Sequence, residues 1–472
     1  MTNDAVKMIH AAIDAVNPYN AVQRHLTMET DGLLQTKGGS TYQAADFDEV
    51  LLVSFGKASS AMSQSVVDRL RQSWSIPIRG IVVVKDGHAT EAELTTLQTE
   101  TNNGVRVLEA SHPVPDARSV DGAKAVLELM EETTERTLVV CCISGGGSAL
   151  FCGPRPGLTL QDLQSTNKAL LASGMSIQQM NVIRKRLETG KGGGLAAAAY
   201  PGTVLTLVLS DILGDPLDLI ASGPTVPDRS TFADAWKLVQ TNEALKEALP
   251  APVLQMLQDG MDGKVEDTPG DDHPVFARCE TVLVGNNELA VLAAAKEAKE
   301  CGYNPVVLGS RVEGEAKDVA GVYIAMAQQL QTGGEFPIAS LPVALVAGGE
   351  TTVSLPDNHG KGGRNQELAL AGAIRMSSLG IRNVVLASAG TDGTDGPTDA
   401  AGAVVDGGTI DRLPGSAEEA MIRHDAYNYL IQYERDDQDG DDGVVDGNGS
   451  RPIIMTGPTG TNVADVCVTL VR

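Results

Sequence analysis

The sequence predicts a soluble α/β protein with two large domains. A chain of 472 residues favours two to four domains, and two large ones are the simplest division. Apolar residues make up 42% of the chain and charged residues 21%, which is typical of globular proteins. Short apolar runs alternate with helical stretches. Because these runs are apolar on both faces, they predict buried parallel strands between helices.

Six such runs follow one another along the chain, and each ends in glycine or a small polar residue. They cover residues 49–54, 138–143, 203–209, 281–284, 343–346 and 384–386. In open parallel sheets, ligands bind outside the carboxyl ends of the strands. Because Gly, Ser, Lys and Asp residues stand at those ends here, the same edge of the sheet is expected to carry the function.

A domain boundary is predicted between Pro250 and Pro274. This segment is polar and rich in Pro and Gly, and a strand–helix unit starts again after it. We therefore expect an N-terminal domain over residues 1–270 and a C-terminal domain over residues 271–472.

A second irregular stretch, residues 434–448, contains seven acidic residues. Asp437, Asp439 and Asp441 have the spacing of a calcium-binding loop. However, the sixth position of that loop is Asp442 rather than Gly, and the twelfth is Asn448 rather than Glu. A solvated surface loop is therefore favoured over a calcium site.

The charge of the chain limits its partners. With 36 basic and 61 acidic residues, the net charge is −25, which repels nucleic acid and requires a local cationic pocket for any anionic substrate.

No apolar run reaches membrane length, and Asp4 and Asp14 stand where an export signal would be apolar. We expect a cytoplasmic protein. Its six cysteines form no CxxC pair and are expected to be buried, reduced thiols.

The second apolar run leads directly into a glycine-rich loop, Ser144, Gly145, Gly146, Gly147 and Ser148. Three successive glycines leave backbone N–H groups free to converge on an anion, and the start of a following helix would add partial positive charge. A flexible tight turn is the alternative. The position at a strand end favours an anion site.

Gly56 and Lys57 follow the first run. A lone lysine is usually a solvated surface charge, but a lysine held beside glycine at a strand end is more often a ligand of phosphate or carboxylate. The chain has no GxxxxGK[ST] motif, so this site is not a P-loop.

Residues 181–195 concentrate positive charge in this acidic protein, on Arg184, Lys185, Arg186 and Lys191. A GxGxxA pattern overlaps the segment, but a helical stretch precedes it instead of a strand, which makes a dinucleotide site improbable. A basic cluster that faces an anionic ligand is favoured, with a solvated helix face as the alternative.

Acidic residues follow three of the other runs. Asp211 follows the third, Glu350 the fifth, and three aspartates the sixth: Asp392, Asp395 and Asp399. Carboxylates near an anion site suit Mg²⁺ binding and the positioning of a hydroxyl nucleophile. For Asp395 and Asp399, an Asx-turn or a helix cap is at least as well supported.

Arg364 lies in Lys361–Glu367, where preceding glycines bring the chain close to a ligand, and its guanidinium matches a carboxylate or phosphate.

The seven histidines are scattered, so no zinc site is predicted. No GxSxG nucleophile elbow occurs. Phosphoryl transfer, which depends on positioning and charge, fits this set of groups best.

Eight segments between residues 51 and 466, in order, resemble the glycerate 2-kinase family, whose C-terminal half is the MOFRL domain. They are SFGKAS, SGGGSAL, NVIRKRLETGKGGGLA, SDILGDPLDLIASGPTVPD, VAGGETTV, GKGGRNQE, SAGTDGTDGPTDAAGA and TGPTGTNVADV. The resemblance implies ATP-dependent phosphorylation of D-glycerate at its 2-hydroxyl, with Mg²⁺. It also implies a larger, Rossmann-like, doubly wound N-terminal domain, a smaller α/β C-terminal domain, and a site in the cleft between them.

The resemblance further implies which residues act. Those that match the polar positions of the family's site, and are predicted to be catalytic, are Lys57, Asp211, Arg364 and Asp392. The residues predicted to bind ATP are Ser144, Gly145, Gly146, Gly147, Ser148, Lys191, Gly349 and Glu350. Those predicted to hold Mg²⁺ are Asp211, Glu350 and Asp392. Which carboxylate is the base stays open, as does the choice between a monomer and a homodimer.

Two alternatives to a kinase remain. Members of this family have also been called hydroxypyruvate reductases, but the chain lacks a strand–GxGxxG–helix fingerprint. A non-catalytic metabolite-binding regulator would be expected to lose Lys57 or Arg364, and both are present.

Overall fold

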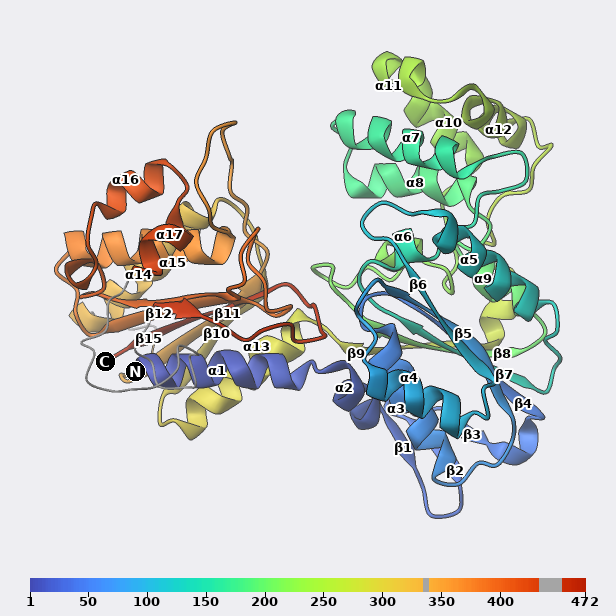
Figure 1. The fold of residues 1–472 in the computed structure, drawn as a ribbon, viewed down its shortest axis with the longest axis horizontal. Helices are drawn as coiled ribbons and strands as arrows, with labels where there is room; N and C mark the ends of the chain where they lie inside the picture. Colours follow the sequence, from blue (N-terminus) through green and yellow to red (C-terminus); the bar gives the residue numbers. More distant parts are fainter. Residues whose placement is uncertain (334–338, 433–451) are drawn as a thin grey trace. The chain divides into compact units, whose positions relative to one another are not determined.

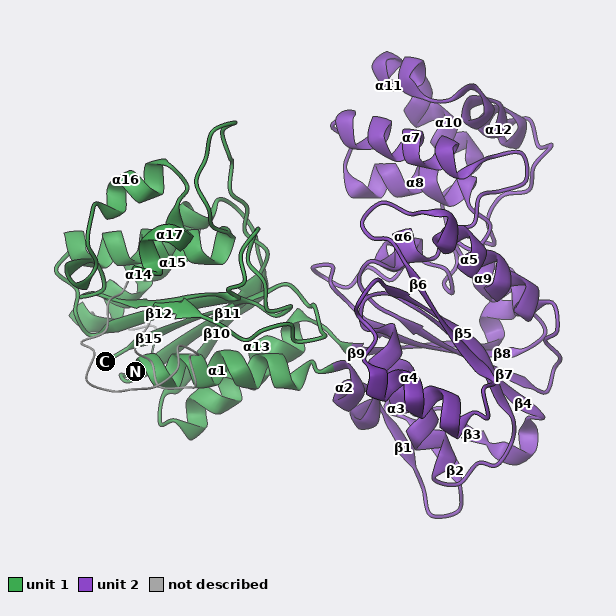
Figure 2. Ribbon diagram, in the orientation of Figure 1, with its two compact units in different colours: residues 1–17, 285–472 green, residues 18–284 purple. Residues whose placement is uncertain are grey.

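The computed structural model describes residues 1–333, 339–432 and 452–472, so the predicted acidic loop 434–448 lies outside the described residues. Two compact units make up the chain (Figure 2). Unit 2 contains residues 18–284, and unit 1 combines residues 1–17 with residues 285–472. The division therefore falls after Val284 rather than after residue 270.

Two elements account for this difference from the predicted boundary. Strand β9 (Cys279–Gly285) is the last strand in the sheet of unit 2, so the strand that we assigned to the C-terminal domain belongs to the N-terminal sheet. Helix α1 (Thr2–Ala15) packs against α13 (Asn287–Glu300), and Tyr303 donates a hydrogen bond to Asp4 at 2.8 Å. The first helix thus belongs to unit 1 although the chain enters unit 2 directly after it.

The main sheet of unit 2 has the strand order β6-β5-β4-β7-β8-β9 (Figure 1). Numbered within the sheet, this is the 3-2-1-4-5-6 order of doubly wound, Rossmann-type folds. The pairs β6–β5, β5–β4, β4–β7 and β7–β8 are parallel. The strands before β9 are β4 (Glu49–Phe55), β5 (Ile78–Lys85), β6 (Val105–Ala110), β7 (Thr137–Ile143) and β8 (Thr203–Leu209). The first three predicted runs are confirmed as β4, β7 and β8.

The helices of unit 2 fall into two groups. One group accompanies the sheet: α2 (Pro18–His25), α3 (Ser59–Arg71), α4 (Glu91–Glu100), α5 (Ala117–Met130), α6 (Gly147–Leu150) and α9 (Gly194–Ala198). The other gathers at one end of the unit around its own apolar core, with Leu170, Ile183 and Phe232 buried in it (Figure 1). It comprises α7 (Leu160–Ala172), α8 (Ile177–Leu187), α10 (Phe232–Gln240), α11 (Glu243–Ala248) and α12 (Ala251–Met261).

A small antiparallel sheet completes unit 2, formed by β1 (Leu26–Met28), β2 (Leu33–Thr36) and β3 (Thr41–Gln43). Single 3-10 turns occur at Ala44–Asp46, Ile220–Ser222 and Pro274–Arg278, and one more at Ile410–Arg412 in unit 1.

The sheet of unit 1 is mixed, in the order β10-β11-β15-β12-β13-β14. Its strands are β10 (Asn304–Val312), β11 (Val343–Gly349), β12 (Val384–Gly390), β13 (Gly402–Asp406), β14 (Ile453–Ile454) and β15 (Asp465–Val471). The two predicted runs at 343–346 and 384–386 are strands, but β15 lies antiparallel between them. An all-parallel sheet is therefore wrong for unit 1, because the last apolar segment of the chain inserts at its centre.

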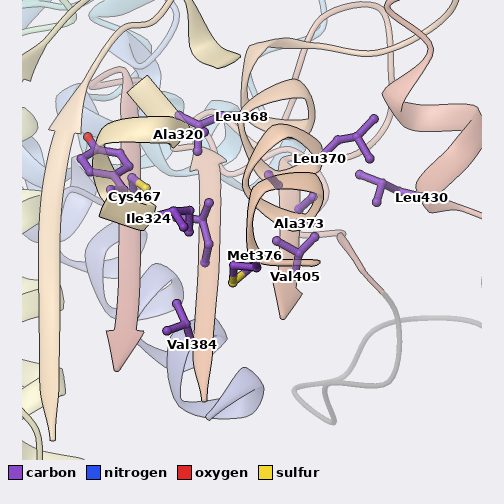
Figure 3. Close-up of a cluster of buried hydrophobic side chains, with 14 of the residues drawn as sticks. Ala320, Ile324, Leu368, Leu370, Ala373, Met376, Val384, Val405, Leu430 and Cys467 are labelled. Atoms are coloured by element: carbon purple, nitrogen blue, oxygen red, sulfur yellow. The ribbon is translucent and has the colours of Figure 1, made fainter. Parts of the chain in front are cut away.

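Helices cover both faces of this sheet. Figure 1 shows α1 and α13 on one face, and α14 (Ala316–Thr332) and α15 (Arg364–Ser378) on the other. Ile324, Leu368 and Met376 pack with Val384 and Val405 in the core beneath α14 and α15 (Figure 3). The short helices α16 (Ala417–Ile422) and α17 (Ala426–Leu430) adjoin α15.

Two expectations about the whole chain can be compared with the described residues. None of the described helices is long and apolar enough to cross a membrane. All six cysteines are free thiols; four are buried as predicted, whereas Cys279 and Cys301 are only half-buried.

Candidate active site

The site begins where the strand order of unit 2 reverses, between β4 and β7. Gly56, after β4, has a φ of +127°, and a Cβ atom there would lie 2.2 Å from Ser144 Oγ, after β7. The Ala58 N–H donates to Ser144 Oγ at 3.0 Å, and the Lys57 N–H donates to the Gly145 carbonyl at 2.9 Å. Only glycine at position 56 permits this approach, which places Lys57 directly beside the glycine-rich loop.

The side chain of Lys57 is half-buried against this loop. Its Cγ lies 3.5 Å from the position that a Cβ of Gly146 would take. Within the described part of the chain, the Lys57 ammonium forms neither an ion pair nor a hydrogen bond. A partly desolvated cation without a protein partner is available to an anionic ligand.

The glycine-rich loop keeps donors free as well. The Gly147 N–H donates to the Ser144 carbonyl at 3.2 Å, but the Gly145 and Gly146 N–H groups have no acceptor among the described residues. The helix that follows, α6, is only four residues long, so the helix charge that we expected adds little. The free backbone donors are what suits this loop to an anion.

Asp211, which follows β8, packs against the same loop. A Cβ atom at Gly145 would lie 2.2 Å from Asp211 Oδ2, so a larger residue there would displace this carboxylate. Burial raises the pKa of Asp211, while its own backbone N–H and the charge of Lys57 act in the opposite direction. Lys57, Asp211 and the loop thus come together at one edge of the sheet.

His112 is a site residue that sequence reasoning missed. A Cβ atom at Gly146 would lie 2.9 Å from its Cδ2 atom, so the imidazole lies directly on the loop. Burial, together with the nearby charge of Lys57, lowers the pKa of His112 to about 4, which keeps the ring neutral at neutral pH. The available signal was its position two residues after β6, but we considered the histidines only as zinc ligands.

A cavity of about 680 Å³ opens at this edge of the sheet, entirely within unit 2. His112, Asp211 and the loop from Ser144 to Ser148 line one part of it. Helices α7 and α8 line another part, with Arg184 on α8, and Lys191 contributes from the turn after α8.

The predicted basic cluster divides into two pairs. Lys185 and Arg186 are buried and pair with Asp228, at 3.4 and 2.7 Å. Burial alone would raise the pKa of Asp228, but Arg186 and Lys185 lower it to about 2. Lys185 and Arg186 therefore fasten α8 to the segment around Asp228, and a ligand-facing cluster of four is wrong because these two charges are satisfied inside the protein.

Lys191 and Arg184 line the cavity but are also held in place. The Lys191 ammonium donates to the Ser148 carbonyl at 3.1 Å and pairs with buried Glu188 at 2.5 Å. The Arg184 Nε donates to Asn167 Oδ1 at 2.8 Å. Because Glu188 balances its charge, Lys191 supplies less net positive potential than Lys57.

In unit 1, the guanidinium of Arg364 already holds carboxylates. Its Nε and Nη2 donate to Asp465 at 2.5 and 2.9 Å, and Nη1 pairs with Glu350 at 2.9 Å. Burial opposes the charged form, but Asp465 and Glu350 raise the pKa of Arg364 above its ordinary value. Asp465 thus occupies Nε and Nη2 of the guanidinium that we expected to bind substrate or phosphate.

The three aspartates after β12 have local partners. Asp392 accepts from the Thr394 N–H at 3.0 Å, as in an Asx-turn, and Asp399 accepts from the Tyr427 hydroxyl at 2.6 Å. Asp395 accepts from the Asn365 and Gln366 N–H groups at 3.0 and 2.9 Å and so caps α15. The cap interpretation is confirmed for Asp395, whereas the partner of Asp399 is a tyrosine side chain rather than a helix start or a turn.

The glycines of unit 1 also serve packing inside the protein. A Cβ atom at Gly363 would lie 2.3 Å from Asp395, and one at Gly349 would lie 2.1 Å from the Val312 carbonyl. The Glu350 N–H donates to that same carbonyl at 2.9 Å. These close approaches explain the glycines without a ligand.

Replacing Asp395 with alanine is expected to lower the free energy of unfolding by about 2 kcal/mol. The substitution removes a buried carboxylate that accepts two N–H bonds at the start of α15, where Gly363 has no side chain to replace it. Thermal unfolding of Asp395→Ala measures the loss. Asp357→Ala, at an exposed position of the same unit, is the control and should change little; equal stability of the two variants would contradict the capping role.

The predicted Mg²⁺ ligands do not form a ready-made metal site. Among the described residues, no three His, Cys, Asp or Glu side chains are grouped so that they could hold a metal ion. Asp211 belongs to unit 2, and Glu350 and Asp392 belong to unit 1. Within unit 2, Asp211 beside the glycine-rich loop is a single carboxylate, which suits an ion held mainly by substrate phosphates.

Comparison with known proteins identifies both halves of the chain. Residues 4–258 match a domain of unknown function, DUF4147, and residues 343–465 match the MOFRL family. The chain is 35% identical to the glycerate 2-kinase of Pyrococcus horikoshii, over 99% of this chain and 96% of that protein. A solved structure, the glycerate kinase of Thermotoga maritima, is 34% identical with a TM-score of 0.82, over 100% of this chain and 99% of that one.

One relative carries a different name. A protein of Agrobacterium vitis, provisionally named a hydroxypyruvate reductase, is 37% identical over 89% of this chain and 99% of its own length. Since the relatives align over nearly their full lengths, both domains and their order are shared. The chain belongs to the glycerate 2-kinase family.

Proposed function

We propose that this protein transfers the γ-phosphoryl group of ATP to the 2-hydroxyl of D-glycerate and releases 2-phosphoglycerate. Its relatives named glycerate 2-kinase and glycerate kinase support this reaction. The observation that carries the proposal is the arrangement at the edge of the unit 2 sheet. There, the free backbone donors of the glycine-rich loop and the half-buried carboxylate of Asp211 line one cavity, and the unpaired Lys57 lies against the same loop.

In the proposed reaction, the 2-hydroxyl oxygen attacks the γ-phosphorus, and the bond to the β–γ bridging oxygen breaks to release ADP. Asp211 accepts the proton of the hydroxyl, a role that suits a carboxylate whose pKa burial has raised. The ammonium of Lys57 and the free N–H groups of Gly145 and Gly146 stabilise the negative charge on the phosphoryl oxygens.

Mg²⁺ would be held mainly by the phosphate oxygens of ATP, and it supplies positive charge to them when bound. Glu350 and Asp392 stay our candidates for further coordination positions. Arg364 stays a predicted catalytic residue. Because Asp465 and Glu350 balance the charge of its guanidinium, we propose that Arg364 mainly holds these two carboxylates in position.

The regiochemistry of the product tests the proposed function. Incubation with ATP, Mg²⁺ and D-glycerate should give 2-phosphoglycerate, which phosphorus NMR distinguishes from the 3-phosphate. Formation of 3-phosphoglycerate alone would contradict the assignment, as would the absence of any phosphorylated product.

Hydroxypyruvate reduction is the second candidate, favoured by the name of the Agrobacterium vitis relative. The chain after β4 reads GKASS, without the glycine fingerprint of nicotinamide-binding folds. Oxidation of NADH or NADPH by hydroxypyruvate, followed by absorbance, measures this activity directly, and we expect none.

A further inference from the structure

Helices α7 and α8 each direct one stripe of side chains into the cavity of unit 2. From α7, the lining residues are Gln164, Asn167, Lys168 and Leu171, at positions i, i+3, i+4 and i+7. From α8 and its C-cap, they are Ile177, Asn181, Arg184 and Glu188, at positions i, i+4, i+7 and i+11. These are the spacings of single helix faces, so two helices form a continuous wall.

This wall is apolar at one end and charged at the other. Leu171, near the end of α7, is 70% exposed, and Ile177, at the start of α8, is 39% exposed. Both adjoin the short turn that joins the two helices. The opposite end of α8 carries Arg184 and Glu188, and Lys191 connects that end to the glycine-rich loop through its bond to the Ser148 carbonyl.

The length of the wall indicates what kind of ligand it fits. From Ile177 to Glu188 the chain advances by about 16 Å, at about 1.5 Å per helical residue. This is comparable to an extended nucleoside triphosphate. The cavity of about 680 Å³ is far larger than a three-carbon acid needs. Glycerate also has only one CH and one CH₂ group, which is too little apolar surface to cover Leu171 and Ile177.

We propose that the cavity binds the nucleotide along α8, with its base against Leu171 and Ile177 and its phosphates toward Ser144–Ser148. The proposal rests on the proposed function, because a kinase needs a nucleotide site. The planar base buries the exposed apolar surface at the turn between α7 and α8. At the charged end, Arg184 and the free N–H groups of the glycine-rich loop, with Lys57 against that loop, complement the phosphates.

Binding of ADP and of inorganic tripolyphosphate to the full-length protein, measured by calorimetry, tests this placement. Tripolyphosphate carries the phosphate charge without a base. In the double variant Leu171→Ser/Ile177→Ser, we expect the Kd for ADP to rise about tenfold or more, because two apolar contacts with the base are lost. The Kd for tripolyphosphate should not change. Neither substitution alters the charge of the cavity.

Met261→Ser is the matched control. Met261, on α12 of the same unit, is 48% exposed and does not line the cavity. Its Kd for ADP should equal that of the parent, and the melting temperatures of all variants should agree.

Three results would overturn the placement. These are an unchanged Kd for ADP in the double variant, an equal loss for ADP and tripolyphosphate, and no ADP binding by the parent. Product formation separates this failure from failure of the proposed function. If the parent makes 2-phosphoglycerate while any of these results is found, the base lies elsewhere and the kinase assignment stands. If no phosphorylated product forms, the proposed function itself fails.

Discussion

Replacing Lys57 with alanine is expected to lower kcat by about 10²–10³-fold, which corresponds to roughly 3–4 kcal/mol of transition-state stabilisation. In a protein of net charge −25, the charge of the transferring phosphoryl group has to be neutralised locally. Lys57 lies beside the glycine-rich loop, and its ammonium has no partner among the described residues. No ion pair or hydrogen bond among the described residues therefore competes with the phosphoryl group for this ammonium.

The comparison variant is Lys124→Ala, on α5 of the same unit, where the side chain is 72% exposed and pairs with Glu128. It should keep parent activity. Steady-state kinetics and the melting temperatures of both variants test whether Lys57 has a catalytic role. If Lys57→Ala keeps more than a tenth of the parent kcat at an unchanged melting temperature, Lys57 has no catalytic role. Arg184 would then be the cation to test, since Glu188 balances Lys191.

The parts of the fold that were predictable from sequence are those encoded locally. Strands β4, β7 and β8 are apolar on both faces, a pattern that a buried parallel sheet imposes on each strand separately. The glycines at positions 56 and 145 were visible because each stands at a strand end. Glycine occurs at these two positions because Ser144 lies close to Gly56 and Asp211 lies close to Gly145. These contacts join different strands of the sheet, so no single segment of the sequence reveals them.

What was not predictable depends on pairing between distant segments. Nothing in the last residues of the chain indicates that β15 inserts between β11 and β12, or that α1 packs against α13. The same applies to Arg364, because its partner Asp465 lies 101 residues further on. A motif shows that a guanidinium is present but not which carboxylate it holds in the folded chain.

The second large effect is expected for Asp211→Asn, which should lower kcat by about 10²–10⁴-fold. The amide keeps the size of the carboxylate, so the close contact with Gly145 is preserved, but it cannot accept the proton of the 2-hydroxyl. Asp121→Asn, at an exposed position on α5, is the control and should retain parent activity. Activity above a tenth of the parent value in Asp211→Asn would show that the base is another residue.

The pH dependence of kcat/KM gives an independent test of this base, because a general base acts only when it is ionised. Burial raises the pKa of Asp211 above its ordinary value of 3.8, so activity should fall on acidification at a higher pH than an exposed aspartate would give. The charge of Lys57 lowers that pKa. Its removal should therefore move the acid limb of the residual activity in Lys57→Ala to still higher pH. An acid limb at the same pH in Lys57→Ala and the parent would show that the titrating group is not the carboxylate beside Lys57.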